Sequence, residues 1–148
     1  MDYFGDDDLY MSERYIRDLI HWHGFQFVPL EARTPEVCLA AVRHYGLALE
    51  FVPLEKRTPE VCLAAVQRNG SALQFVPPDE RTYEACLAAV RQCGSALKWV
   101  SLEMKTPEMC LVALENGGDY AFEWVPELLR TPALRKLANK SRRDWHTR

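Results

Sequence analysis

The sequence lacks the features that would place it in a membrane or assign it a chemical reaction. No apolar run approaches the roughly 18 residues needed to span a bilayer. The acidic start MDYFGDDDLY lacks the basic-then-apolar order of a secretory signal. No HExxH, GxSxG, CxxC or phosphate-cradling glycine-rich loop occurs. We therefore expect a cytoplasmic protein that is not an enzyme and that holds no cofactor or metal ion.

The chain instead repeats one 24-residue pattern. An eroded copy begins at Trp124, and residues 12–26 resemble the end of a degenerate first copy, in which Gly24 corresponds to Gly46. Each copy is too small to bury its own apolar residues, so the pattern predicts that neighbouring units stack on one another. The four clear copies, of which the last gains one residue near Gly117-Gly118, begin at Phe27, Phe51, Phe75 and Trp99.

Each copy carries the signals of a helix start and a helix stop. Thr58 stands at an N-cap position and Pro59 at the first helical position. The apolar run at 61–66 predicts a helix that is buried on several sides, and the capping signal and alanine pair disfavour a strand there. Gly70 is expected to end this helix as a C′ glycine, and a second short helix is expected at 71–76. The equivalent caps are Thr34, Thr82, Thr106 and Thr131, and the equivalent glycines are Gly46, Gly94 and Gly118.

These units predict an all-α fold, an α-solenoid of about five to six 24-residue helix-turn-helix repeats with capping ends. We expect one domain over residues 1–148. Residues 1–26 would form an N-terminal cap with the degenerate repeat, and residues 27–123 the four clear repeats. Residues 124–148 would form the eroded repeat and a basic C-terminal capping helix.

The pattern Thr-Pro-Glu-x-Cys-Leu-Ala-Ala-Val, followed by Gly-x-Ala-Leu-x-Phe-Val-Pro, resembles a bacterial helical-repeat family of unassigned role, domain of unknown function 4116. The resemblance covers about residues 27–126. It implies an all-helical repeat protein, and it supplies no activity, cofactor or catalytic residue to carry over to this chain.

Four of the five cysteines occupy one position of the repeat. Their spacing does not suit zinc, whose ligand pairs lie two to four residues apart, and stacked units would hold equivalent thiols beyond the reach of a disulfide. We expect small buried thiols that fill the same space in each unit. The four are Cys38, Cys62, Cys86 and Cys110, and Cys93, near the end of a helix, is the candidate for an exposed thiol.

A basic residue precedes each capping threonine. Stacked units would align these cations along one edge, where they could bind phosphates or an acidic peptide. Glutamates and aspartates at nearby repeat positions outnumber them, so structural pairing or capping is the favoured interpretation. The basic residues are Arg33, Arg57, Arg81, Lys105 and Arg130.

Positions that differ between copies mark the candidate partner-binding surface. Positions that never change must satisfy the same packing or capping in every unit, whereas positions that vary are free of that shared demand. In a solenoid the variable positions align on one face, where repeat proteins commonly bind partners. Plain variation of solvent-exposed residues is the alternative for any single position. The candidates are Arg43, His44, Tyr45, Gln67, Arg68, Asn69, Arg91 and Gln92.

Charge is distributed unevenly along the chain. Residues 1–125 hold 11 Lys and Arg against 19 Asp and Glu, whereas residues 126–148 hold 7 against 2. The tail predicts a terminal helix with Leu134, Leu137, Ala138 and Trp145 in its apolar stripe. Its cations either balance the acidic body, which is the favoured interpretation, or touch nucleic acid or another anionic surface. These cations are Arg135, Lys136, Lys140, Arg142 and Arg143.

The sequence therefore indicates a protein–protein interaction module, a non-enzymatic scaffold whose partner is another protein. One alternative is a nucleic-acid-associated protein that uses the basic C-terminal helix. Another is a small inhibitor or immunity-type protein, because an acidic body suits a basic target. No membrane partner is expected.

Overall fold

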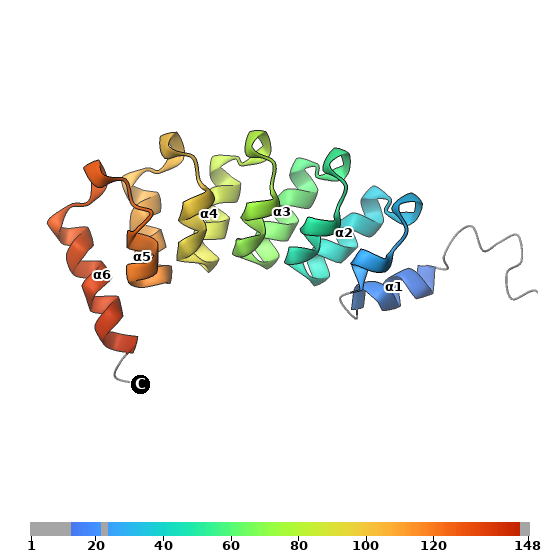
Figure 1. The fold of residues 1–148 in the computed structure, drawn as a ribbon, viewed down its shortest axis with the longest axis horizontal. Coiled ribbons are helices and arrows are strands. Elements are labelled where there is room, and N and C mark those ends of the chain that lie inside the picture. Colours follow the sequence, from blue (N-terminus) through green and yellow to red (C-terminus); the bar gives the residue numbers. More distant parts are fainter. Residues whose placement is uncertain (1–12, 22–23, 146–148) are drawn as a thin grey trace, which may run out of the picture.

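The computed structural model describes residues 13–21 and 24–145, and every regular element in these ranges is helical (Figure 1). The prediction of an all-α fold is confirmed. Of the expected N-terminal cap, residues 1–12 and 22–23 lie outside the described residues. None of the described helices combines the length and apolar character needed to cross a bilayer.

The central units repeat the same three elements. The first is a ten-residue α-helix: α2 (Pro35–His44), α3 (Pro59–Arg68) and α4 (Tyr83–Gln92). The second is a six-residue 3-10 helix: η3 (Gly46–Phe51), η5 (Gly70–Phe75) and η7 (Gly94–Trp99). The third is a single-turn 3-10 helix: η4 (Leu54–Lys56), η6 (Pro78–Glu80) and η8 (Leu102–Met104). The expected second short helix is therefore present in the tighter 3-10 form.

The two ends depart from this unit. The N-terminal elements are α1 (Glu13–His21), η1 (Phe25–Phe27) and η2 (Leu30–Ala32). The C-terminal elements are α5 (Pro107–Phe122), η9 (Glu127–Leu129) and α6 (Pro132–Trp145). The prediction that Gly118 ends its helix is wrong, because α5 continues through it for 16 residues. The continuous helix buries Ala121 completely and replaces the six-residue 3-10 helix of this unit.

Threonine side chains begin the α-helices, as predicted. Thr58 Oγ1 accepts the N–H of Val61 at 3.4 Å, which satisfies one of the otherwise unpaired donors of the first turn. Thr34, Thr82, Thr106 and Thr131 make the same bond at 3.2–3.3 Å.

The repeated glycines permit close packing between units. The α3 helix ends at an extended C-cap residue, Asn69 (φ −149°, ψ 113°), and Gly70 already opens the next 3-10 helix. Gly70 therefore directly follows the C-cap, at the C′ position expected from the sequence, but its φ lies outside the left-handed region. A Cβ atom on Gly70 would lie 2.4 Å from the carbonyl oxygen of Ala89 in α4, and one on Gly46 would lie 2.5 Å from that of Ala65 in α3. Only glycine lets each 3-10 helix approach the next α-helix so closely.

Helices α2 to α5 lie side by side in chain order (Figure 1). Each six-residue 3-10 helix packs against the α-helix of its own unit and against the next one. The core runs continuously along this row. One unit contributes Val61, Cys62, Ala65 and Val66 from α3, and Ala72, Leu73 and Val76 from the segment that follows.

Candidate functional site

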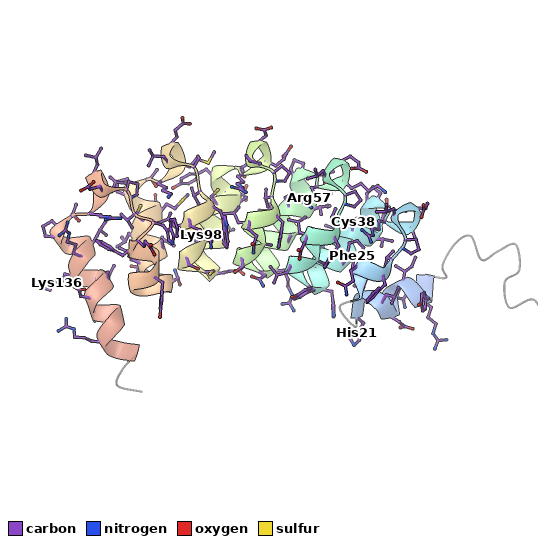
Figure 2. The ribbon with its side chains drawn as sticks, in the orientation of Figure 1. His21, Phe25, Cys38, Arg57, Lys98 and Lys136 are labelled. Atoms are coloured by element: carbon purple, nitrogen blue, oxygen red, sulfur yellow. The ribbon has the colours of Figure 1, made fainter. Side chains whose placement is uncertain are left out.

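The row of helices has two long edges. The single-turn helices η2, η4, η6, η8 and η9 lie along one edge, uppermost in Figure 1, which we call the tip edge (residues 30–32, 54–56, 78–80, 102–104 and 127–129). The α-helices run from this edge to the opposite one, where the variable residues 43–45, 67–69 and 91–93 lie. We call this second set the ridge. Figure 2 places Arg57 toward the tip edge and His21 at the edge of the ridge.

The first ridge position of each unit faces solvent. Arg43, Gln67 and Arg91 are exposed in the last turns of α2, α3 and α4. The helices lie side by side, so these two arginines and the glutamine between them form one row. The structure thus brings together the residues that the sequence analysis singled out from separate copies.

The second ridge position links neighbouring units. His44 Nε2 donates to the carbonyl oxygen of His21 at 3.1 Å, and the two imidazole ring centroids lie 5.1 Å apart. Arg68 Nε donates to the carbonyl oxygen of His44 at 3.1 Å. The Gln92 amide donates to the carbonyl oxygen of Gln67. These side chains vary in type between copies, yet each bonds the unit before it, so the variation here does not mean freedom from a structural role.

The third ridge position is half-buried at the C-cap. Asn69 Oδ1 accepts the N–H of Ser71 at 2.9 Å. The thiol of Cys93 lies 3.1 Å from Ser95 Oγ and accepts from Ser71 Oγ at 3.9 Å. Burial by itself would raise the pKa of Cys93, but hydrogen bonds from these hydroxyls and from two backbone N–H groups lower it. Cys93 is therefore the most readily ionised of the cysteines.

The basic residue before each cap bonds backbone carbonyls. Arg57 Nε donates to the carbonyl oxygen of Val52 (2.9 Å), and Nη1 donates to that of Phe75 (2.6 Å) in the next unit. Nη2 donates to the carbonyl oxygen of Glu50 at 3.2 Å. The guanidinium thus caps the ends of two consecutive 3-10 helices. The structure therefore favours a structural role for this basic residue, in which it bonds backbone carbonyls and not side-chain carboxylates. Arg33 and Arg81 repeat all three bonds, Arg130 makes two and Lys105 makes one, to Trp124.

The four repeated cysteines are buried, as predicted, and each is a free thiol in the structure. Cys62 Sγ lies 3.5 Å from the carbonyl oxygen of Arg57, to which the thiol donates. Burial raises the pKa of Cys62 to about 11, so this thiol stays protonated and unreactive near neutral pH. Within the described ranges, no group of three His, Cys, Asp or Glu side chains could hold a metal ion.

A pocket of about 560 Å³ lies between α1 and α2. Its apolar lining comes from Ile16 and Ile20 on α1 and from Val37 and Ala40 on α2. The degenerate first unit covers α2 incompletely, since Val37 is half-buried whereas its counterpart in α3, Val61, is buried. The pocket is thus a gap between two imperfectly matched helices.

Sequence reasoning missed the leucines of the tip edge. Leu30, Leu54 and Leu102 occupy one repeat position and are 61%, 69% and 71% exposed. The available signal was the recurrence of leucine in three of the four clear copies, but recurring positions were attributed to packing or capping. The structure shows that packing does not account for it.

The basic helix α6 packs against α5 at the end of the row. Ala138 is buried, and Leu134 and Leu137 are half-buried, as the predicted apolar stripe requires. The side chains of Trp145 and Arg142 lie outside the described ones. The remaining candidate contacts for an anionic surface are exposed, namely Arg135, Lys136, Lys140 and Arg143.

These elements define the class of the molecule as an all-helical chain of packed helices. Residues 34–81, which span two consecutive units from the cap Thr34 to Arg81, match the family model described as Domain of unknown function (DUF4116). The resemblance to this family is thereby confirmed over those residues. No curated protein and no solved structure gave a significant match.

Proposed function

We propose that the chain is an α-solenoid that binds another protein through its ridge. The observation that carries the proposal is the row formed by Arg43, Gln67 and Arg91, which are exposed at equivalent positions and change from arginine to glutamine and back to arginine along the row. A scaffold that repeats while its outward side chains change is the arrangement by which helical-repeat proteins distinguish partners.

The bonds between units favour such a role. His44, Arg68 and Gln92 tie the helix ends together beside the exposed row, and Arg57 bonds the ends of two successive 3-10 helices. The spacing of the outward side chains is therefore fixed before a partner arrives. A preorganised surface loses less conformational entropy on binding.

A cross-linking capture from the native host, followed by mass spectrometry, tests the proposal. The wild-type chain is compared with a ridge variant, Arg43→Ser/Gln67→Ala/Arg91→Ser, and with a tip variant, Leu30→Ser/Leu54→Ser. We expect a specific partner whose affinity for the ridge variant is at least ten-fold weaker. Full retention of that partner by the ridge variant would count against the proposal, as would recovery of no specific partner.

A nucleic-acid-associated role is the second candidate, because Lys136, Lys140 and Arg143 are exposed on α6. Phosphate contacts would make binding to a DNA or RNA oligonucleotide weaken steeply as the salt concentration rises. A titration at low and at physiological salt distinguishes the two roles. Absence of binding at low salt removes this candidate.

A further inference from the structure

The tip edge exposes an apolar side chain in unit after unit. Leu30, Leu54 and Leu102 stand at the same repeat position, and the third unit places Pro78 there, also exposed. A leucine that is more than 60% exposed contributes little to the core, and exposed apolar surface arranged in a series commonly marks an interaction site.

The leucine is retained where the scaffold has changed. The fourth copy differs from the second at 10 of its first 20 positions, including replacement of Pro53 by Ser101 and of Ala64 by Val112. It nevertheless keeps the pair Leu102-Glu103. Folding places no demand on an exposed leucine, so a contact outside the chain is the physical reason that fits its retention.

A carboxylate follows each of these apolar residues. The four carboxylates, all exposed, are Glu31, Glu55, Asp79 and Glu103. The neighbouring cations are engaged elsewhere: Arg57 donates to three backbone carbonyls, and Lys56 Nζ donates to the carbonyl oxygen of Arg33 at 2.6 Å. The edge therefore alternates apolar and negatively charged groups, which complement a chain that alternates apolar and positively charged ones.

We propose that the tip edge binds an extended, basic segment of a partner protein, with an apolar side chain at every third residue. Packed helices lie about 8–10 Å apart. Three residues of a polyproline-type segment advance about 9 Å, so one apolar side chain would meet each unit. Lysine or arginine side chains between them would meet the carboxylates. This inference rests on the proposed function only for the statement that the ligand is a protein. It is otherwise independent of the ridge, because the tip edge lies on the opposite edge of the row of helices.

Fluorescence anisotropy with labelled synthetic peptides tests this inference on the full chain. The probe is Leu-Lys-Pro repeated four times, and the control peptides are its scrambled form, with the leucines adjacent, and Leu-Glu-Pro repeated four times. The chain variants are an apolar tip variant, Leu30→Ser/Leu54→Ser/Leu102→Ser, an acidic tip variant, Glu31→Gln/Glu55→Gln/Glu103→Gln, and the ridge variant as the matched control. All substituted residues are exposed, so far-UV circular dichroism should be unchanged.

We expect the wild-type chain to bind the probe at least ten-fold more tightly than either control peptide. Both tip variants should lose at least ten-fold in affinity, and the ridge variant should bind as the wild type does. Equal affinity for the scrambled peptide, wild-type affinity in the tip variants, or no binding by the wild-type chain would overturn the inference. A dimer in light scattering that only the tip variants abolish would assign the edge to a second copy and would also overturn it.

The two proposals fail separately. If the ridge variant loses the captured partner and no peptide binds at the tip edge, the proposed function stands and this inference is wrong. If peptide binding depends on Leu54 and Glu55 and no captured partner depends on the ridge, the proposed function is wrong and the inference about the tip edge stands.

Discussion

Arg57 offers the most informative single perturbation, because its guanidinium joins two units through backbone carbonyls. Arg57→Met removes the charge and all donors while keeping an unbranched apolar stem of similar length. The substitution therefore reports the hydrogen bonds and not the packing of the stem.

The magnitude follows from the geometry. Two of the three bonds, to Val52 at 2.9 Å and to Phe75 at 2.6 Å, are partly buried, whereas the bond to Glu50 at 3.2 Å is exposed. Bonds to a charged group contribute about 1.5–3 kcal/mol, and the lower value suits a partly exposed guanidinium. Arg57→Met should therefore cost about 3 kcal/mol. For a chain of this size that corresponds to a fall of about 6–12 °C in Tm.

Urea unfolding followed by far-UV circular dichroism measures this change. The matched control is Arg91→Met, at an exposed arginine of the ridge, which should alter the unfolding free energy by less than about 0.5 kcal/mol. Arg57→Lys should lie between them, since Lys105 holds the same position in the fourth copy and donates a single bond at 3.0 Å. Equal stability of Arg57→Met and Arg91→Met would refute the reasoning.

Four further predictions concern the repeat. Gly70→Ala should cost more than about 2 kcal/mol in a urea titration, because the new Cβ would meet the carbonyl oxygen of Ala89 at 2.4 Å, and a stabilised variant would contradict the packing role of glycine. Thr58→Ala should lower the unfolding free energy by about 1 kcal/mol through loss of the cap, measured the same way. A thiol reagent at pH 8 should modify Cys93 before Cys62, as peptide mapping would show. Burial raises the pKa of Cys62 from 9.0 to about 11. The contribution of this protonated thiol to the free energy of unfolding is therefore complete below pH 9 and is lost as the pH rises toward 11. Cys62→Ala should reduce this decline in stability at high pH.

Local features of the fold could be predicted from sequence because they depend on neighbouring residues. The N-cap at Thr58 and the ten-residue helix α3 follow from side chains within a few positions of one another. The buried thiol of Cys62 follows from an uninterrupted apolar run that leaves no polar face.

The helix end at Gly70 could be predicted, but its close-packing role could not, because glycine serves both left-handed turns and close backbone contacts. The contact that decides the matter, with Ala89, lies in the next unit. The same limit applies to Gly118, whose helix continues to Phe122 and buries Ala121.

The surfaces were predictable only in part. The exposed row of Arg43, Gln67 and Arg91 was found because the copies differ there. The tip leucines were missed because a comparison of copies cannot separate a recurring buried residue from a recurring exposed one such as Leu54. For Arg57 the sequence left open whether it pairs with a carboxylate or caps a helix, because backbone carbonyls leave no trace in the sequence.

In our interpretation, different residues of the same repeat carry the scaffold and the recognition of a partner. The most direct test of this interpretation exchanges two ridge residues, Gln67→Arg together with Arg91→Gln, which preserves composition and net charge. We expect an unchanged urea midpoint and an affinity at least ten-fold weaker for the partner recovered by cross-linking. Unchanged affinity would contradict this interpretation, and so would loss of the fold.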